Sequence, residues 1–462
     1  MRRRFLLEAT LLVATALALA ACGGETEAPS METPRSTPAG PVAIDLWHSE
    51  TAANLETLER MVAQFNDSQG GIRVRPIFQG NPEEAVVKLL GSLRSGQAPA
   101  LALVAGVDAQ MLIDSGAVVP VQQFVDGEDY DTSDLDTRAV RYYTTQGKLW
   151  GMPLSVTVPI LYYNKAVFRE VGLDPERPPQ DLEEVRQYSE KIQKRDDSGQ
   201  LVRSGIALDI PFWVEYVLAE HGDLLVNQDN GHDGRATEVL FNNETGRWFI
   251  QWWHDMVDQG LAINVGRNPT QVESALAIAV GRAAMTLGAS NSLRSVVNAL
   301  EAAGPAAAGI EIGVGRLPGA PGGTGASLLQ TNGFWIFSQA AQEEQDAAWR
   351  FTKWFIEPEQ QADWFAGTGY LPVSRSAIDR PAAREVVSRY PLFQVALDLY
   401  MGAPATSAAL GALLGPHRQV GESIVQAVER MLAGSKEPLQ ALEEAAAEAN
   451  QLIEEYNRRV PD

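Results

Sequence analysis

The chain has 462 residues and is strongly acidic, with 37 Lys and Arg residues, 59 Asp and Glu residues and a formal net charge of −22 at pH 7. This balance argues against a nucleic-acid partner, because binding to a phosphate backbone requires basic patches that release counterions. Since the sequence contains one cysteine, it can form no disulfide of its own and must be stabilised by a hydrophobic core.

The amino terminus has the pattern of a secretory signal. Three arginines at positions 2–4 precede an uncharged run of 13 residues, 9–21, that is rich in Leu and Ala. This run is too short for a transmembrane helix, which needs about 20 apolar residues. We expect residues 1–21 to be removed, and the formal charge of the remaining chain is then −24.

Cys22, the only cysteine, follows this signal directly. The residues LAAC at positions 19–22 resemble the bacterial lipobox, in which the thiol is acylated and the chain is cut in front of it. Two or more acyl chains give a stable membrane anchor, whereas a single chain is marginal. The alternative is an ordinary secretory signal followed by a chance cysteine.

Residues 22–41 have one Met as their only large apolar residue, which predicts a disordered tether. About 420 residues follow, more than one core usually supports, so we expect two lobes. The first of these residues alternate between strand and helix patterns. Strands are predicted at 42–48, 71–78 and 100–105, with helices at 50–66 and 82–96 between them.

A second alternating block begins at residue 158. It contains the strand patterns 158–163, 205–210, 283–288 and 309–318, and helix patterns at 181–194 and 244–260. Trp248, Trp252 and Trp253 lie at helical spacing and are interpreted as core. The glycine-rich stretch 319–327 interrupts regular structure before a further strand, a helix and a mostly helical carboxyl end. Alternating strands and helices predict mainly parallel sheets, with ligands outside the carboxyl ends of the strands.

Six stretches then stand out by their order and spacing: IDLWHSE, FNDSQGGIRVRPIFQGN, LRSGQAPALALV, PILYYNKAVFREVGLDPERPPQDLEEV, GRAAMTLGASNSLRS and WFAGTGYLPVSRSA. Together they resemble the extracellular solute-binding proteins of bacterial ABC importers, most closely the glycerol-3-phosphate-binding branch. The resemblance implies an α/β fold of two lobes, each a mainly parallel sheet flanked by helices, joined by a multi-strand hinge. Lobe one would comprise 42–155 and 326–371, and lobe two 156–325 and 372–462.

The same resemblance implies a solute in the cleft between the lobes, held as the hinge closes. A sugar or polyol needs an aromatic plate and polar side chains of fixed geometry. Residues at the carboxyl ends of the first two strands fit this need: Trp47, Ser49, Glu50, Phe78, Gln79 and Asn81. The other expected ligand contacts are Asp108, Thr157, Trp213, Ser290, Asn291, Asn332, Tyr370 and Arg418. Trp47 and Phe78 could equally be core residues, and Tyr370 a turn residue.

The chain departs from the glycerol-phosphate binders at three places. Phe78 stands where they carry Tyr, and Ala105-Gly106 near where they carry a carboxylate, with Asp108 the nearest acid. Leu410 stands where they carry a phosphate-binding arginine, and the only nearby cation is Arg418. Since bidentate Arg is the strong phosphate contact, we expect a neutral carbohydrate or polyol in preference to glycerol 3-phosphate.

Two other classes remain open: a secreted carbohydrate-active enzyme with two carboxylates, and a sensory lipoprotein on the same scaffold. No carboxylate pair stands out, and no two of the five histidines have helical metal-ligand spacing. We expect no cofactor, no metal site and no catalytic residue. The expected partners of a monomeric chain are the solute, the ABC permease subunits and, through the lipid anchor only, the membrane.

Overall fold

The computed structural model describes residues 40–460 except for 210–212, 268–271 and 305–308. The signal, Cys22 and all but the last two residues of the expected tether lie outside the described residues. Gly40 and Pro41 are exposed and lead into the first strand. Within the described ranges, no helix combines the length and the apolar character needed to cross a membrane.

The chain begins with the βαβαβ unit that the sequence predicts. Its elements are β1 (Val42–His48), α1 (Ala52–Ser68), β2 (Ile72–Phe78), α2 (Pro82–Ser95) and β3 (Leu101–Ala105). One face of α1 is buried, as its apolar spacing predicts, through Leu58, Met61, Val62 and Phe65. Asn81 caps α2, because its side chain accepts a hydrogen bond from the backbone N of Glu84 at 2.9 Å.

The first sheet has the strand order β14-β6-β13-β3-β1-β2. Its later strands are β6 (Met152–Thr157), β13 (Gln330–Ile336) and β14 (Leu371–Pro372). β1 pairs parallel with β2 and β3, but β13 pairs antiparallel with β3 and β6, and β14 is antiparallel to β6. The sheet is therefore mixed.

The second sheet is also mixed, with the order β10-β9-β11-β7-β12. Its strands are β7 (Pro159–Asn164), β9 (Leu201–Leu208), β10 (Ala262–Asn264), β11 (Ala283–Ala289) and β12 (Ile312–Arg316). β9 is parallel to β10 and β11, whereas β7 is antiparallel to β11 and β12. The prediction of mainly parallel sheets is wrong, because β13 and β14 in the first sheet and β7 in the second pair antiparallel with their neighbours. β6 and β7, separated only by Val158, connect the two sheets directly.

Helices and short elements complete the unit formed by residues 41–462. In chain order they are η1 (Gly106–Asp108), α3 (Ala109–Asp114), α4 (Gln122–Glu128), α5 (Thr137–Tyr142), β4 (Thr144–Thr145), β5 (Lys148–Leu149), α6 (Lys165–Glu170), α7 (Leu182–Ile192), β8 (Lys194–Arg195), α8 (Trp213–His221), α9 (Asn227–Asn230), α10 (Glu244–Asp258), α11 (Val272–Ala279), η2 (Ser290–Ser292), α12 (Leu293–Ala303), α13 (Gln342–Ile356), α14 (Pro358–Thr368), η4 (Arg375–Asp379), α15 (Pro381–Arg389), α16 (Leu392–Gly402), α17 (Ser407–Leu410), α18 (His417–Leu432) and α19 (Pro438–Asn457).

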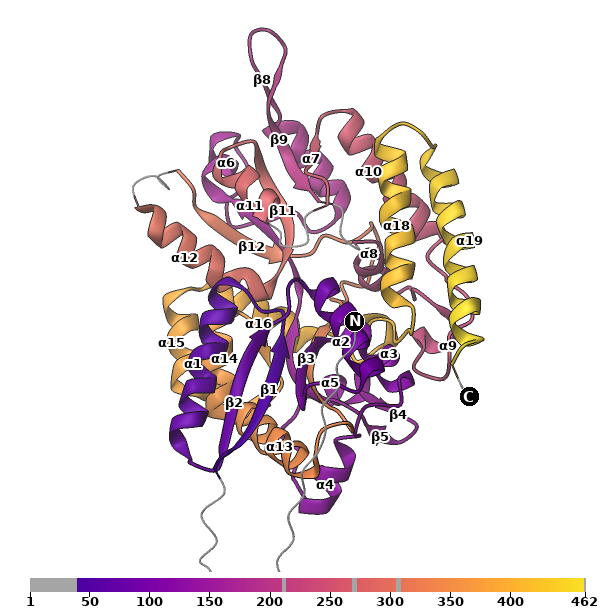
Figure 1. Cartoon of the computed structure of the whole chain (residues 1–462). Coiled ribbons are helices and arrows are strands. Elements are labelled where there is room, and N and C mark those ends of the chain that lie inside the picture. The colour runs from indigo at the N-terminus through magenta and orange to yellow at the C-terminus, as the bar shows by residue number, and fades with distance from the viewer. Residues whose placement is uncertain (1–39, 210–212, 268–271, 305–308, 461–462) are drawn as a thin grey trace, which may run out of the picture. The chain divides into compact units, whose positions relative to one another are not determined.

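The tryptophan-rich helix α10 belongs to the core of the second sheet, together with α18 and α19, which lie side by side in Figure 1. Trp252 and Trp253 are buried, and Trp248 packs against the same core. The Nε1 of Trp252 donates to the backbone O of Leu182 at 3.0 Å. The interpretation of these tryptophans as core is confirmed.

The glycine-rich crossing between β12 and β13 is held by Glu220 at the end of α8. The backbone O of Glu220 accepts hydrogen bonds from Thr324 Oγ1 and Gly325 N, both at 3.1 Å, and its carboxylate pairs with Arg316. Burial raises the pKa of Glu220 to about 7 although Arg316 opposes the shift. Gly325 has a φ of +75°, a conformation that side chains disfavour.

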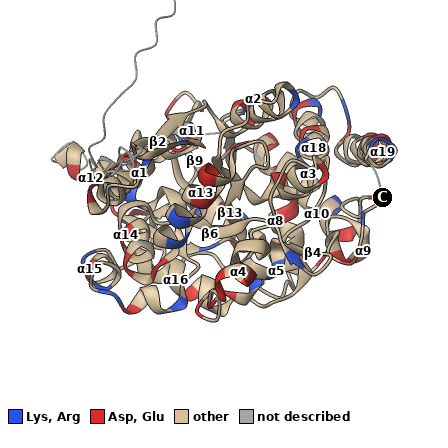
Figure 2. Cartoon of the chain, turned by 60° about the horizontal axis from the view of Figure 1, so that its bottom comes forward, with Lys and Arg blue, Asp and Glu red and all other residues tan. Residues whose placement is uncertain are grey.

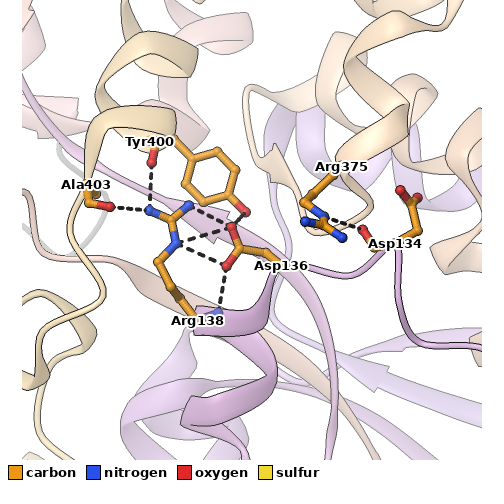
Figure 3. A network of polar contacts seen from close by, with 6 residues as sticks. All are labelled: Asp134, Asp136, Arg138, Arg375, Tyr400 and Ala403. Atoms are coloured by element: carbon orange, nitrogen blue, oxygen red, sulfur yellow. Dashed lines mark hydrogen bonds and ion pairs between the residues drawn. The ribbon is translucent and has the colours of Figure 1, made fainter.

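A polar network fastens the segment after β14 to the loop that precedes α5 (Figure 3). Arg138 donates to Asp136 Oδ2 at 2.6 Å and to the backbone O of Ala403 at 2.6 Å, and Tyr400 donates to Asp136 Oδ2 at 2.7 Å. Beside it, the backbone N of Arg375 donates to the backbone O of Asp134 at 2.9 Å.

Helix α16 ends at this network, and α15 and α16 both contribute to the hydrophobic core that contains the first sheet, together with Ile160, Tyr162 and Val314 of the second sheet. The buried residues of the two helices in that core are Ala383, Val386, Phe393, Ala396, Leu397 and Tyr400. The lobe boundaries, including the predicted one at residue 372, remain predictions.

Basic and acidic residues are interspersed along the described chain, as the blue and red segments of Figure 2 show. Many of them form exposed ion pairs, such as Arg267 with Glu422 at 2.8 Å and with Glu429 at 2.7 Å. Exposed pairs contribute little, about 0–1 kcal/mol each. The acidic excess therefore fits a surface of solvated charges that repel one another.

Candidate ligand-binding site

A pocket lies at the carboxyl ends of β1, β2 and β3, where a parallel βαβ unit binds its ligands. Its cavity volume is about 20 Å³, and it is partly open to solvent. Among the expected ligand contacts, it is lined by Trp47, Ser49, Gln79, Asp108 and Arg418. The structure thus brings together five residues that were selected from separate parts of the sequence.

Asp108 and Arg418 form a bidentate ion pair in this pocket. Arg418 Nε lies 2.6 Å from Asp108 Oδ1, and Nη2 lies 2.7 Å from Oδ2. The Asp108 side chain is 1% exposed and that of Arg418 is 25% exposed. Burial alone would lower the pKa of Arg418, but the hydrogen bonds and charge of Asp108 outweigh it and raise the pKa.

The pair also joins the two cores. Asp108 ends the short helix η1, which follows β3 of the first sheet. Arg418 lies in the first turn of α18, whose apolar face is buried in the second core through Val420, Ile424, Ala427, Val428 and Met431.

A second cluster surrounds the hydroxyl of Tyr370. This hydroxyl donates to Glu50 Oε1 at 3.3 Å, and the side chains of Asn291 and Asn332 lie near enough to lower its pKa. Glu50 follows β1, Asn332 lies on β13 of the first sheet, and Asn291 follows β11 of the second sheet. All four were expected ligand contacts, and the structure places them in one cluster at which the two sheets meet.

Burial controls the protonation of this cluster. It raises the pKa of Glu50 to about 7, against hydrogen bonds from Asn54 and Tyr370 that lower it. Burial likewise raises the pKa of Tyr370, which therefore stays a neutral donor. At neutral pH the cluster offers a partly ionised carboxyl, one phenol and two amides, which can bond to hydroxyl groups as donors or acceptors.

The position of Tyr370 is fixed by its neighbours in sequence and in space. Its ring stacks on Trp364 with a centroid distance of 5.5 Å and an interplanar angle of 10°. Gly369 has a φ of +95°, and a Cβ there would lie 2.3 Å from the backbone O of Ser290. Only glycine therefore permits this close approach between the segment before β14 and the one after β11.

Phe78 is 52% exposed, so the structure does not support its reading as a core residue. Its ring lies 6.0 Å from that of His48, centroid to centroid. Trp47 is partly buried and packs against the first core. An exposed aromatic ring next to a polar pocket suits the C–H face of a sugar.

Four other expected contacts have structural roles in the fold. Asn81 caps α2. Ser290 Oγ accepts a hydrogen bond from the backbone N of Val158 at 3.3 Å, and Trp213 donates to Asp209 Oδ1 at 2.9 Å. Thr157 is buried at the end of β6. Contacts of these residues with a ligand remain predictions.

Sequence reasoning missed His48 and Tyr142. His48 lines the pocket, its Nδ1 accepts a hydrogen bond from the backbone N of Glu50 at 3.2 Å, and burial lowers its pKa to about 4. The Tyr142 hydroxyl lies 3.0 Å from the backbone O of Gly106 and 3.1 Å from that of Ala412. The position of His48 between Trp47 and Ser49 could have indicated it, but nothing in the sequence marks Tyr142.

Comparison with protein families matches residues 60–395 to the family described as bacterial extracellular solute-binding protein. The chain belongs to this family. A relative in it is the sn-glycerol-3-phosphate-binding periplasmic protein UgpB of Yersinia pseudotuberculosis, 27% identical over 424 residues, which cover 90% of this chain and 93% of the relative.

Solved structures of solute-binding proteins share the fold. UgpB from Mycobacterium tuberculosis in complex with glycerophosphocholine has a TM-score of 0.74 at 18% identity, over 90% of this chain and 99% of that one. The cyclic alpha-maltosyl-1,6-maltose binding protein from Arthrobacter globiformis has a TM-score of 0.69 at 25% identity, also over 90% and 99%. The predicted two-lobed α/β fold of periplasmic binding proteins is confirmed, with mixed sheets.

Proposed function

We propose that this chain is the lipid-anchored substrate-binding protein of an ABC importer. It reversibly binds a sugar, a polyol or a glycerol phosphate between its lobes and delivers the solute to a membrane permease. The observation that carries the proposal is the cluster of Glu50, Asn291, Asn332 and Tyr370, which draws hydrogen-bonding groups from both sheets to one point. Membership of an extracellular solute-binding family supports it.

Each part of the site has a role in such binding. The Glu50 carboxyl and the two amides bond to hydroxyls in several directions, and Tyr370 supplies a phenol between the lobes. Phe78 offers an apolar face to the ring of a sugar. Because Asn291 follows a strand of the second sheet and Glu50 a strand of the first, a ligand bonded to both would favour the closed arrangement of the hinge.

The proposal is tested by calorimetric titration of the chain from residue 22 with a panel of sugars, polyols and glycerol phosphates. We expect saturable binding of one solute class, with Tyr370→Phe weakening it about tenfold, since one hydrogen bond is worth about 0.5–1.5 kcal/mol. Tyr390→Phe is the matched control. It also removes a hydroxyl bonded to a glutamate, Glu301 at 2.6 Å, but at an exposed site away from the cluster.

Binding of no solute in the panel, or equal losses in the two variants, would contradict this assignment. Conversion of a solute into products would instead favour the carbohydrate-active enzyme. A sensory lipoprotein would bind solute in the same way, and uptake measured in cells lacking the chain distinguishes it, because an importer component is then required for uptake.

The lipid anchor is a separate prediction. Acylation of Cys22 would keep the chain at the outer face of the cell membrane, where a permease can receive its solute. Mass spectrometry of the mature amino terminus is expected to find a diacylated Cys22 as the first residue, and Cys22→Ser is expected to release the chain from the membrane fraction. A free thiol at Cys22 would contradict the prediction.

A further inference from the structure

Arg418 is the only Lys or Arg among the described residues that line the pocket. Two acids lie beside it. Its Nε and Nη2 face the two oxygens of Asp108 at 2.6 and 2.7 Å, and its Nη1 lies 3.6 Å from Glu83 Oε1. One of the two edges of the guanidinium that can take a phosphate in bidentate fashion, Nε–Nη2, is therefore occupied by a carboxylate of the protein, and Glu83 lies beside the other edge.

We propose that Asp108 is a built-in counterion of Arg418 that makes the pocket select an uncharged polyhydroxylated solute and reject one that carries a phosphate. This inference rests on the proposed function and names the substrate class of the same site.

The physical reason is the burial of Asp108. A phosphate that displaced the carboxylate from Arg418 would leave a nearly inaccessible side chain, 1% exposed, charged and without its partner. Unpaired buried charge is strongly unfavourable. If the pair stayed intact, the phosphate would face two acids, Asp108 and Glu83, and one cation. A neutral solute avoids both costs, because its hydroxyls can donate to the free lone pairs of Asp108 and accept from the remaining Arg418 N–H groups.

The described lining of the pocket contains no Lys or Arg besides Arg418. His48, the only other basic side chain among the described lining residues, has its pKa lowered to about 4 by burial and is neutral at pH 7. The other polar side chains of the lining, Ser49 and Gln79, are uncharged. The charge of the pocket is therefore decided by the balance between Asp108 and Arg418.

The test measures the affinity of glycerol 3-phosphate by calorimetry at pH 7. Four chains are compared: wild type, Asp108→Asn, the double variant Asp108→Asn/Arg418→Gln, and Asp379→Asn. We expect weak or no binding by wild type and a gain of about tenfold or more in Asp108→Asn, because the freed guanidinium forms charge-assisted bonds to phosphate. The gain should vanish in the double variant. Asp379→Asn, the matched control at a 71% exposed acid that pairs with Arg384, should stay within about twofold of wild type.

Tight binding of glycerol 3-phosphate by wild type would overturn the inference. So would an unchanged affinity of Asp108→Asn for glycerol 3-phosphate, provided that this variant retains a cooperative thermal transition. Should Asp108→Asn fail to fold, the single variant Arg418→Gln decides. The inference expects its weak glycerol 3-phosphate binding to equal that of wild type, and a clear loss would show that Arg418 already binds the anion.

The inference and the proposed function fail in different ways. If wild type bound no sugar or polyol in the panel, the proposed function would fail, while the four phosphate affinities would still decide the role of Asp108. If wild type bound glycerol 3-phosphate tightly, solute binding would stand and the counterion role would not.

Discussion

Replacing Asp136 with Ala is expected to lower the free energy of unfolding by about 3–5 kcal/mol, the range for breaking a buried ion pair. The side chains of Asp136 and Arg138 are 8% and 12% exposed. Without the carboxylate, the Arg138 guanidinium is left with two backbone carbonyls, and the Tyr400 hydroxyl loses its acceptor. Denaturant unfolding followed by circular dichroism measures the change.

Asp379→Ala is the matched control for this variant. Asp379 also pairs with an arginine, Arg384 at 2.9 Å, but the two side chains are 71% and 68% exposed. Its removal should change the unfolding free energy by less than about 0.5 kcal/mol. Equal effects of the two variants would refute the claim that the Asp136 network fastens α16 to the loop before α5.

The wild-type protein should lose the stability that this network contributes when the pH is lowered. Burial alone would raise the pKa of Asp136, but hydrogen bonds from Arg138 and Tyr400 outweigh it and hold the pKa below its ordinary value. The Asp136 carboxylate therefore contributes its full stability at pH values above the ordinary carboxyl pKa. This stability is lost as the pH falls through the lowered pKa of Asp136 in the folded protein.

The second large effect is expected from Glu50→Gln, which should stabilise the ligand-free protein at pH 8. The folded-state pKa of Glu50 is raised to about 7, so its contribution to stability is full below the ordinary carboxyl pKa and is lost as the pH rises through 7. Above that pH, holding the buried carboxylate charged costs about 3 kcal/mol. Thermal and denaturant unfolding of both chains from pH 4 to 8 should show a stability gain that disappears toward pH 4.

The same variant should bind its solute about 10- to 100-fold more weakly at pH 8, because a hydrogen bond to a charged acceptor is worth about 1.5–3 kcal/mol. A variant that is more stable to unfolding but binds its solute more weakly is expected when the replaced group contributes to ligand binding and destabilises the folded state. Glu56→Gln, on the exposed side of α1, should change neither quantity. A variant that lost both stability and affinity would instead identify Glu50 as a purely structural residue.

Part of the candidate site followed from local sequence patterns. The alternation of strands and helices from residue 42 to 105 placed Trp47, Ser49 and Gln79 at strand ends, and the structure puts all three in the pocket. Asn291, Asn332 and Tyr370 came from the resemblance to the solute-binding family. The approach of Tyr370 to Glu50, and of the two asparagines to Tyr370, is a property of the tertiary structure, since Tyr370 and Glu50 are 320 positions apart.

By itself, the sequence determined the alternating elements, the apolar faces that bury them and the acidic charge, because these depend on neighbours a few residues apart. The tertiary structure decided which strands run antiparallel and which acid meets which cation. Asp108 and Arg418 lie 310 positions apart, and local patterns carry no information on such a pair. Its bidentate geometry exists only because β3 and α18 are brought to the same pocket by two separate cores.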